Sequence, residues 1–211
     1  MTVICPTVTA YDLHEYREQM ERIELFAKRV HIDLMDGHLA PTKSPGLKHV
    51  WWPRGLRADI HLMYKRPLPQ LPMLIKLRPH MVVIHAEAEV DHALFAASLH
   101  KVGIRAGLAL LQETSVESVK SIVKSFDHVL IFSGRLGYHG GQADLSLTPK
   151  ISEIRALQSD MEIGWDGGIN DQNVRQLVDA GVNVLNAGGF IAHAEDPKSA
   201  YAKLETATQA R

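Results

Sequence analysis

Segments with the residue pattern of β-strands alternate with segments of helical periodicity along nearly the whole chain. Strands are predicted at residues 29–35, 57–63, 81–87, 104–110, 128–132, 161–166 and 183–187, and a short apolar run ended by Pro6 precedes them. The alternation repeats about eight times with a period of roughly 25 residues, and no linker interrupts it. This pattern predicts a (β/α)₈ TIM barrel in one domain spanning residues 1–211 rather than an open doubly wound sheet.

Helices are expected between these strands. Residues 13–28 carry apolar side chains at every third or fourth position, and Asp12 can cap the first turn of such a helix. Residues 90–101 form a second helical pattern, which Gly103 closes. The last predicted helix covers residues 197–207.

Composition excludes several classes of protein. The chain has 211 residues, of which 45% are hydrophobic, and its formal net charge is −1. This balance gives no basic surface for nucleic acid or for an anionic membrane. No apolar run reaches the length needed to span a bilayer, and Cys5, the single cysteine, excludes an intrachain disulfide. We therefore expect a soluble, cytoplasmic protein without nucleic-acid or membrane partners.

The predicted strand at 29–35 carries ionisable side chains on one of its faces. Alternation places its aliphatic residues on one side and His31, Asp33 and Met35 on the other, before an Asp36-Gly37 turn. A histidine and an aspartate two residues apart on a strand point the same way, so they can share a metal ion or a proton. An internal histidine–aspartate hydrogen bond in an ordinary strand is an equally good interpretation of this segment alone.

Further polar residues lie at the carboxyl ends of other predicted strands, namely His61, His85, Glu87 and Asp166. In a barrel these ends converge on one mouth, where barrel enzymes carry out their chemistry. Two histidines and two aspartates from three strands make a plausible site for a divalent ion such as Zn²⁺, Fe²⁺ or Mn²⁺. Each histidine alone is more simply a satisfied interior imidazole, but their shared structural position weakens that interpretation.

Glycine pairs follow each of the last three predicted strands. They are Gly140-Gly141, Gly167-Gly168 and Gly188-Gly189. A single pair is usually a turn, but glycines at these places let backbone N–H groups approach a ligand. The late loops of a barrel commonly bind phosphate, so the three pairs predict a phosphate site.

Several of these strings resemble the ribulose-phosphate 3-epimerase family. The most specific is His-x-Asp-x-Met-Asp-Gly-His, which here occupies residues 31–38. The similarity extends from Pro6-Thr7 to Asp196-Pro197, and its other motifs are Asp59-Ile-His61-Leu-Met63 with Pro67, His85-Ala-Glu87, Gly140-Gly-Gln142 and Asp166-Gly-Gly-Ile169.

This resemblance implies a barrel of the ribulose-phosphate-binding type with one divalent ion per chain, Zn²⁺, Fe²⁺, Mn²⁺ or Co²⁺. The implied metal ligands are His31, Asp33, His61 and Asp166, and Asp33 and Asp166 would also form the catalytic acid/base pair. A sugar phosphate is the implied small-molecule substrate. Copies of the chain are expected to associate through barrel faces as a homo-oligomer.

The resemblance also implies a set of substrate contacts. Thr7 stands where the family has a serine near the substrate, and Met35 and Met63 match methionines that pack beside the reacting carbon. The implied substrate-binding residues are Thr7, Met35, His61, Met63, Gly140, Gly141, Gly167, Gly168, Gly188 and Gly189.

The chain departs from the family in the loop that follows the sixth strand. The usual Asn-Pro-Gly-Phe-Gly-Gly-Gln string here reads Leu-Gly-Tyr-His-Gly-Gly-Gln over residues 136–142, and the third methionine expected near Ser133 is missing. Leu111-Gln112 replaces an Asn-Pro pair, and the segment 40–56 is shortened. All four implied ligands are present, so the chemistry is better supported than the identity of the sugar.

The leading hypothesis is therefore a metal-dependent 3-epimerase that converts D-ribulose 5-phosphate to D-xylulose 5-phosphate. Inversion beside a ketone needs a proton removed from one face and another returned to the opposite face, which two carboxylates flanking an enediolate accomplish. The alternatives are the same reaction on another ketose phosphate, such as D-allulose 6-phosphate, and a sugar-phosphate-binding barrel without turnover. A Schiff-base aldolase is disfavoured because no lysine ends a predicted strand.

Overall fold

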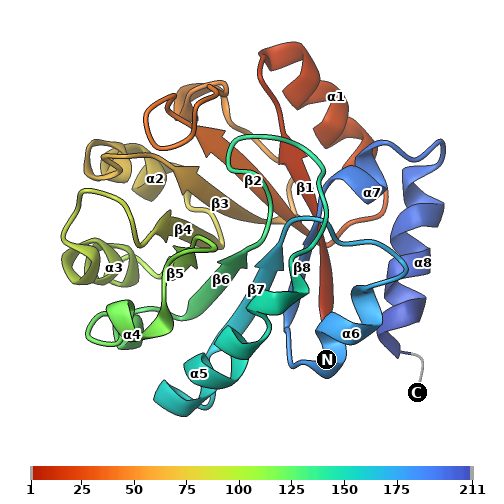
Figure 1. Cartoon of the computed structure of the whole chain (residues 1–211). Coiled ribbons are helices and arrows are strands. Elements are labelled where there is room, and N and C mark those ends of the chain that lie inside the picture. Colours follow the sequence, from red (N-terminus) through yellow and green to blue (C-terminus); the bar gives the residue numbers. More distant parts are fainter. Residues whose placement is uncertain (1, 210–211) are drawn as a thin grey trace.

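Eight parallel strands close into a barrel in which neighbours in sequence are neighbours in space (Figure 1). The structure is a computed structural model that describes residues 2–209. The strands are β1 (Val3–Thr9), β2 (Arg29–Met35), β3 (Arg57–Met63), β4 (Met81–His85), β5 (Arg105–Leu110), β6 (His128–Phe132), β7 (Glu162–Asp166) and β8 (Val184–Ala187). Pairing of β8 with β1 completes the ring, so the predicted (β/α)₈ TIM barrel is confirmed.

Helices cover the outside of the barrel (Figure 1). They are α1 (Leu13–Ile23), α2 (Leu71–Leu77), α3 (His92–His100), α4 (Val116–Val119), α5 (Pro149–Leu157), α6 (Val174–Asp179), α7 (Gly189–Ala192) and α8 (Pro197–Gln209). Short 3₁₀ turns occupy Leu47–His49, Leu68–Gln70, Val123–Ser125 and Leu145–Leu147. No helix among the described residues has both the length and the hydropathy that crossing a bilayer requires.

Helix α1 begins as the sequence predicts but ends earlier. The Asp12 carboxylate accepts hydrogen bonds from the backbone N–H groups of His14 and Glu15, which caps the first turn. The helix ends at Ile23 rather than at residue 28, because the chain turns there to enter β2. The backbone N–H groups of Phe26 and Ala27 both point at the Ile23 carbonyl in that turn.

Strand β1 continues through the proline that was expected to end it. It pairs with β8 over Val3–Pro6 and with β2 over Thr7–Thr9. Pro6 therefore stands where β1 passes from one neighbour to the other, a position that tolerates a residue without a backbone N–H. The extra length brings Thr7 and Thr9 to the carboxyl end of the barrel.

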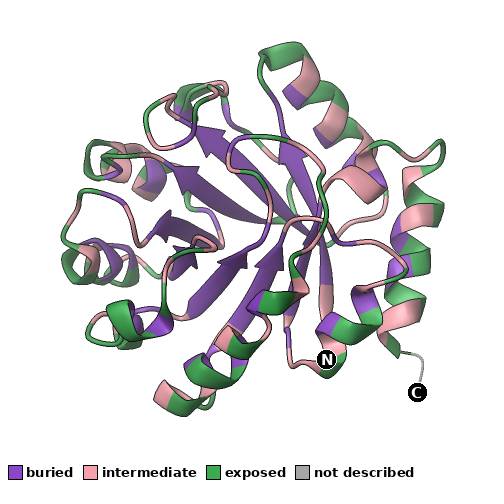
Figure 2. Ribbon diagram, viewed as in Figure 1, coloured by how far each residue is buried: buried purple, intermediate pink, exposed green. Residues whose placement is uncertain are grey.

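Most of the apolar core lies between the strands and the helices. Figure 2 shows the barrel strands as almost entirely buried. Alternate strand residues such as Ile32 and Ile60 join the cluster that packs against the helices. A second, smaller cluster inside the barrel consists of Met81, Val83, Ala109 and Leu130. On either side of this cluster, toward the two ends of the barrel, the interior contains buried ionisable side chains.

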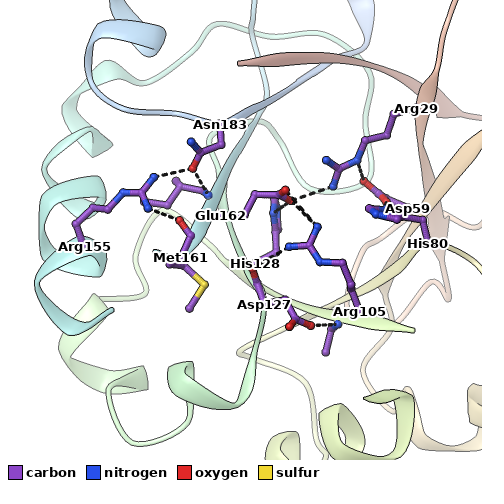
Figure 3. Close-up of polar contacts among 12 residues, drawn as sticks. Arg29, Asp59, His80, Arg105, Asp127, His128, Arg155, Met161, Glu162 and Asn183 are labelled. Atoms are coloured by element: carbon purple, nitrogen blue, oxygen red, sulfur yellow. Dashed lines mark hydrogen bonds and ion pairs between the residues drawn. The ribbon is translucent and has the colours of Figure 1, made fainter. Parts of the chain in front are cut away.

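The amino-terminal end of the barrel interior holds a network of ion pairs (Figure 3). Arg29 is 4% exposed and donates from Nε to Asp59 Oδ2 at 2.6 Å and from Nη2 to Glu162 Oε1 at 3.0 Å. His80 Nδ1 lies 2.7 Å from Asp59 Oδ1. Burial raises the pKa of the Asp59 carboxyl, but contacts with His80 and Arg29 outweigh burial and lower it. This end of the barrel therefore neutralises its buried carboxylates with its own side chains.

Replacing Arg29 with methionine should destabilise the barrel by about 3–5 kcal/mol, because Asp59 would remain charged and buried without its partner. The loss should be greatest near neutral pH and should shrink as the pH falls and protonates Asp59. Urea unfolding followed by circular dichroism measures it. The matched control is Arg17→Met, which removes only an exposed pair with Glu21 and should leave the midpoint unchanged. Equal midpoints for wild type and Arg29→Met would contradict this account.

Candidate metal centre

Four ionisable side chains from three strands meet at the carboxyl-terminal end of the barrel interior. His31 and Asp33 come from β2, His61 from β3 and Asp166 from the end of β7. Each offers a ligand atom, and these atoms all lie within 4.8 Å of one another. The β2–β3 register places Asp33 directly opposite His61. The structure therefore brings together all four residues of the predicted metal set, and it buries all of them.

Two buried atoms of this cluster lie close to possible partners but make no hydrogen bond with the described residues. His61 Nδ1 lies 2.9 Å from Asp33 Oδ1, and His31 Nε2 lies 3.3 Å from the same oxygen. His31 Nε2 is also 3.4 Å from Asp166 Oδ2, yet neither atom makes a hydrogen bond within the described part of the chain. Buried polar atoms normally have partners. A cation ligated by these nitrogens and oxygens would satisfy both atoms, so the residues fit a divalent metal.

Two neighbouring carboxylates determine the electrostatics of the cluster. Burial, together with the negative charge of Asp33, raises the pKa of Asp166. Burial also raises the pKa of Asp33, but contacts with His31 and His61 outweigh burial and lower it far below its ordinary value. Burial lowers the pKa of His31, whereas the two carboxylates raise it to about 10. The cluster thus lacks positive charge, which a proton on His31 or a divalent cation can provide.

His61 differs from His31 in its electrostatic surroundings. Burial lowers the pKa of His61 to about 3, and the neighbouring His85 and His31 contribute in the same direction against the effect of Asp33. His61 is therefore a neutral imidazole, which is the form that binds metals. His85 itself is fully buried, and its Nε2 lies 2.8 Å from His61 Nε2.

A cavity of about 260 Å³ opens beside the cluster at the mouth of the barrel. Both carboxylates line it, together with Met63 and Thr7. The glycine pairs Gly140-Gly141, Gly167-Gly168 and Gly188-Gly189, which the resemblance implies as substrate contacts, also line it. Two predicted contacts, His61 and Met35, do not lie on its wall. Met35 is buried against Ala40, Met63 and Leu136, and its sulfur lies 3.0 Å from the Thr42 hydroxyl oxygen.

The glycine pair after β7 is required by close packing of the backbone. A Cβ on Gly168 would lie 2.0 Å from the backbone nitrogen of Ala143, and one on Gly167 would lie 2.2 Å from that of Gly134. Both glycines also have positive φ angles, +109° for Gly167 and +70° for Gly168. The loop 133–143 therefore packs directly on this pair, and both glycines line the cavity.

The same loop crosses the mouth of the barrel and reaches β1 (Figure 1). The ring nitrogen Nε2 of His139 is hydrogen-bonded to the carbonyl of Thr9, and the Thr42 hydroxyl donates to the carbonyl of Gly137 at 2.7 Å. His139 and Tyr138 both line the cavity, and His193 approaches His139 edge-on at 6.0 Å between ring centroids. The segment that departs from the family pattern thus forms one wall of the cavity.

Two residues of the centre were not singled out in the sequence. The Thr9 hydroxyl donates to Asp33 Oδ2 at 2.6 Å and so orients that carboxylate. Asn186 pairs in register with Asp166, and its side-chain oxygen is buried without a hydrogen bond from the described residues. Each is a polar residue at an inward-facing strand position, and that alternation was the available signal.

The comparisons with known proteins agree with this geometry. Residues 3–192 match the ribulose-phosphate 3 epimerase family. The ribulose-phosphate 3-epimerase of Helicobacter pylori (strain ATCC 700392 / 26695) is 30% identical over 214 residues, which cover 98% of each chain. The chain belongs to the ribulose-phosphate 3-epimerase family. The ribulose-phosphate 3-epimerase of Bacillus subtilis (strain 168) is 27% identical over 213 residues, with 97% of this chain and 98% of the relative covered.

Solved structures of other barrels share the fold at low sequence identity. The 3-keto-L-gulonate-6-phosphate decarboxylase of Vibrio cholerae superposes with a TM-score of 0.76 at 13% identity, covering 99% of this chain and 97% of the other. This likeness shows the fold alone. All members of the metal cluster lie within the part matched to the ribulose-phosphate 3-epimerase family.

Replacing Gly168 with alanine should displace the loop 133–143, because the added Cβ has no room beside Ala143. We expect a destabilisation of about 1–3 kcal/mol and faster amide hydrogen exchange in that loop, measured by mass spectrometry. Gly140→Ala is the matched control. Gly140 also has a positive φ angle, +77°, but open space surrounds its Cβ position, so only the backbone penalty applies. Identical exchange in the two variants would contradict the packing argument.

Proposed function

We propose that this chain is a divalent-metal-dependent epimerase that inverts C3 of a ketose phosphate, converting D-ribulose 5-phosphate to D-xylulose 5-phosphate. The observation that carries the proposal is the pair of carboxylates, Asp33 and Asp166, which reach one cavity from different strands beside two imidazoles. The names of the relatives from Helicobacter pylori and Bacillus subtilis support the same activity. Membership in the family supports an isomerase acting on a sugar phosphate.

The two carboxylates would act as the acid/base pair. One removes the proton from C3, which leaves a flat enediolate, and the other returns a proton to the opposite face of C3. Each turnover therefore exchanges one C3 proton for another and leaves the number of protons unchanged. Thr9 would support this step by holding Asp33 through Oδ2, since its hydroxyl donates to that oxygen. Met63 would supply an adaptable apolar wall.

His31, Asp33, His61 and Asp166 would together hold one ion, Zn²⁺, Fe²⁺, Mn²⁺ or Co²⁺. When bound, such an ion supplies positive charge that stabilises the negative oxygen of the enediolate. The cluster supports this assignment because His31 Nε2 and Asp166 Oδ2 are both buried without a hydrogen bond from the described residues. The imidazoles contribute neutral nitrogen ligands, and the carboxylates contribute the balancing charge.

The phosphate group of the substrate would lie against Gly167-Gly168 and Gly188-Gly189. These glycines line the cavity without side chains, so their backbone N–H groups are open to an anion. Thr7 lies beside Gly188, and its hydroxyl is buried without a hydrogen bond from the described residues. Gly140-Gly141 would complete the wall on the loop side.

We further propose that residues 1–211 act as one barrel domain. Pairing of β1 with β8 supports this, because strands near both ends of the chain are needed to close the barrel. Association into a homo-oligomer and a cytoplasmic location remain predictions.

Replacing either Asp33 or Asp166 with asparagine should reduce epimerisation by about 10²–10⁴-fold, because each removes one partner in the proton transfer. The assay follows xylulose 5-phosphate formation and deuterium incorporation at C3 in D₂O by NMR, using metal-loaded protein. Asp171→Asn, which changes a partly exposed carboxylate paired with Lys203, is the matched control and should retain full activity. Near-normal turnover by either active-site variant would refute the two-carboxylate mechanism.

A second candidate keeps the reaction and changes the sugar. Tyr138 and His139 replace the usual loop residues and line the cavity, which favours a different ketose phosphate such as D-allulose 6-phosphate. The same exchange assay, run with both sugars, separates the two. If protein shown to hold its metal exchanges the C3 proton of neither sugar, a binding barrel without turnover is favoured.

A further inference from the structure

His61 is linked to a carboxylate on the side away from Asp33. His61 Nε2 lies 2.8 Å from His85 Nε2, and His85 Nδ1 lies 3.2 Å from Glu87 Oε2. The two imidazole planes are inclined at only 22°, with ring centroids 4.9 Å apart. Neither imidazole is exposed to solvent. His61, His85 and Glu87 therefore form a continuous hydrogen-bonded chain that ends at the metal centre.

Glu87 is fixed by donors on its other oxygen. The Leu111 backbone N–H donates to Oε1 at 3.2 Å, and the Thr114 hydroxyl donates to the same atom. Burial raises the pKa of Glu87, but the hydrogen bonds from His85 and Thr114 outweigh burial and lower it to about 2. Glu87 is thus an ionised carboxylate, which can only accept hydrogen bonds.

The positions of the protons in this chain follow from Glu87. Because the carboxylate only accepts, a ring proton of His85 lies on Nδ1, and when His85 carries that proton alone its Nε2 is an acceptor. His61 must donate to it from Nε2. His61 Nδ1 therefore carries a lone pair, and it faces Asp33 Oδ1 at 2.9 Å. Two acceptors at this distance repel unless a cation lies between them.

We infer that Glu87 and His85 are positioning residues that fix the tautomer of His61 and direct its Nδ1 lone pair toward the metal. This inference rests on the proposed function, because it assumes that the cluster binds a divalent ion. Neither residue belongs to the metal cluster itself. Glu87 acts through His85 and His61, in the way that carboxylates behind ligating histidines raise metal affinity.

A similar pair at the other end of the barrel provides the control. Glu162 Oε1 lies 2.9 Å from Nδ1 of His128, which is buried, but Glu162 also contacts Arg29 and Arg105 in the amino-terminal network (Figure 3). This pair has no contact with the metal cluster. Glu162→Gln should therefore lower stability without changing metal affinity.

The test is the affinity of purified protein for Zn²⁺ alone, measured by competition with a chelating dye. Glu87→Gln should weaken binding by about 10- to 100-fold. The amide oxygen of the new side chain must face the Leu111 N–H donor, so the amide NH₂ faces His85 and reverses the tautomers of His85 and His61. Wild-type affinity in Glu87→Gln would overturn the inference, whereas failure of the wild type to bind Zn²⁺ would overturn the proposed function.

A second measurement needs no variant. Long-range ¹⁵N–¹H NMR spectra of histidine-labelled wild-type protein distinguish the imidazole tautomers. The inference requires a proton on Nδ1 of His85 and on Nε2 of His61 in the Zn²⁺-loaded protein. The opposite tautomers in the Zn²⁺-loaded protein would refute it, even where Glu87→Gln fails to fold.

Discussion

Two carboxylates and two imidazoles, all buried and within 4.8 Å of one another, determine what the rest of this barrel must provide. Placing two anions in a low-dielectric interior costs several kcal/mol each unless positive charge compensates them. At the amino-terminal end, Arg29 provides that charge for Asp59. At the carboxyl-terminal end, the cluster of His31, Asp33, His61 and Asp166 contains neither arginine nor lysine, so its positive charge comes from a proton on His31 or from a bound cation. Buried aspartates and histidines thus stabilise the fold at the amino-terminal end of the barrel, and at the carboxyl-terminal end they form the proposed metal site.

The fold was predictable because its signal repeats along the whole chain. Most strands are short, rich in apolar residues and followed by a helix, and a closed parallel barrel covered by helices buries both faces of such strands. Local departures needed the structure. Pro6 lies within β1 because the strand changes partners there, and α1 stops at Ile23 because the chain must turn into β2. Helix α7 was missed because its four residues are too few to show a period.

The metal cluster was only partly predictable from the residues themselves. His31 and Asp33 share a strand face, so their proximity follows from alternation, whereas Asp166 joins them only once the barrel closes. The predicted barrel supplied that link, and the family resemblance then singled out the four ligands among the polar residues at its mouth. Contacts behind the cluster could not be read from sequence, because the pairing of His85 with His61 depends on the β3–β4 register and on side-chain orientation. Met35, expected beside the substrate, is buried against Ala40, Met63 and Leu136, a packing that depends on the loops that cover the end of β2.

The most direct test of this account is anomalous diffraction from crystals of the protein grown with Mn²⁺ or Zn²⁺. We predict one anomalous peak per chain, located among His31 Nε2, His61 Nδ1 and the facing oxygens of Asp33 and Asp166. Such a peak would satisfy the two buried atoms that now have no hydrogen bond from the described residues. Crystals that contain stoichiometric metal but place the peak elsewhere would contradict the account, because the carboxylates would then need a different source of positive charge.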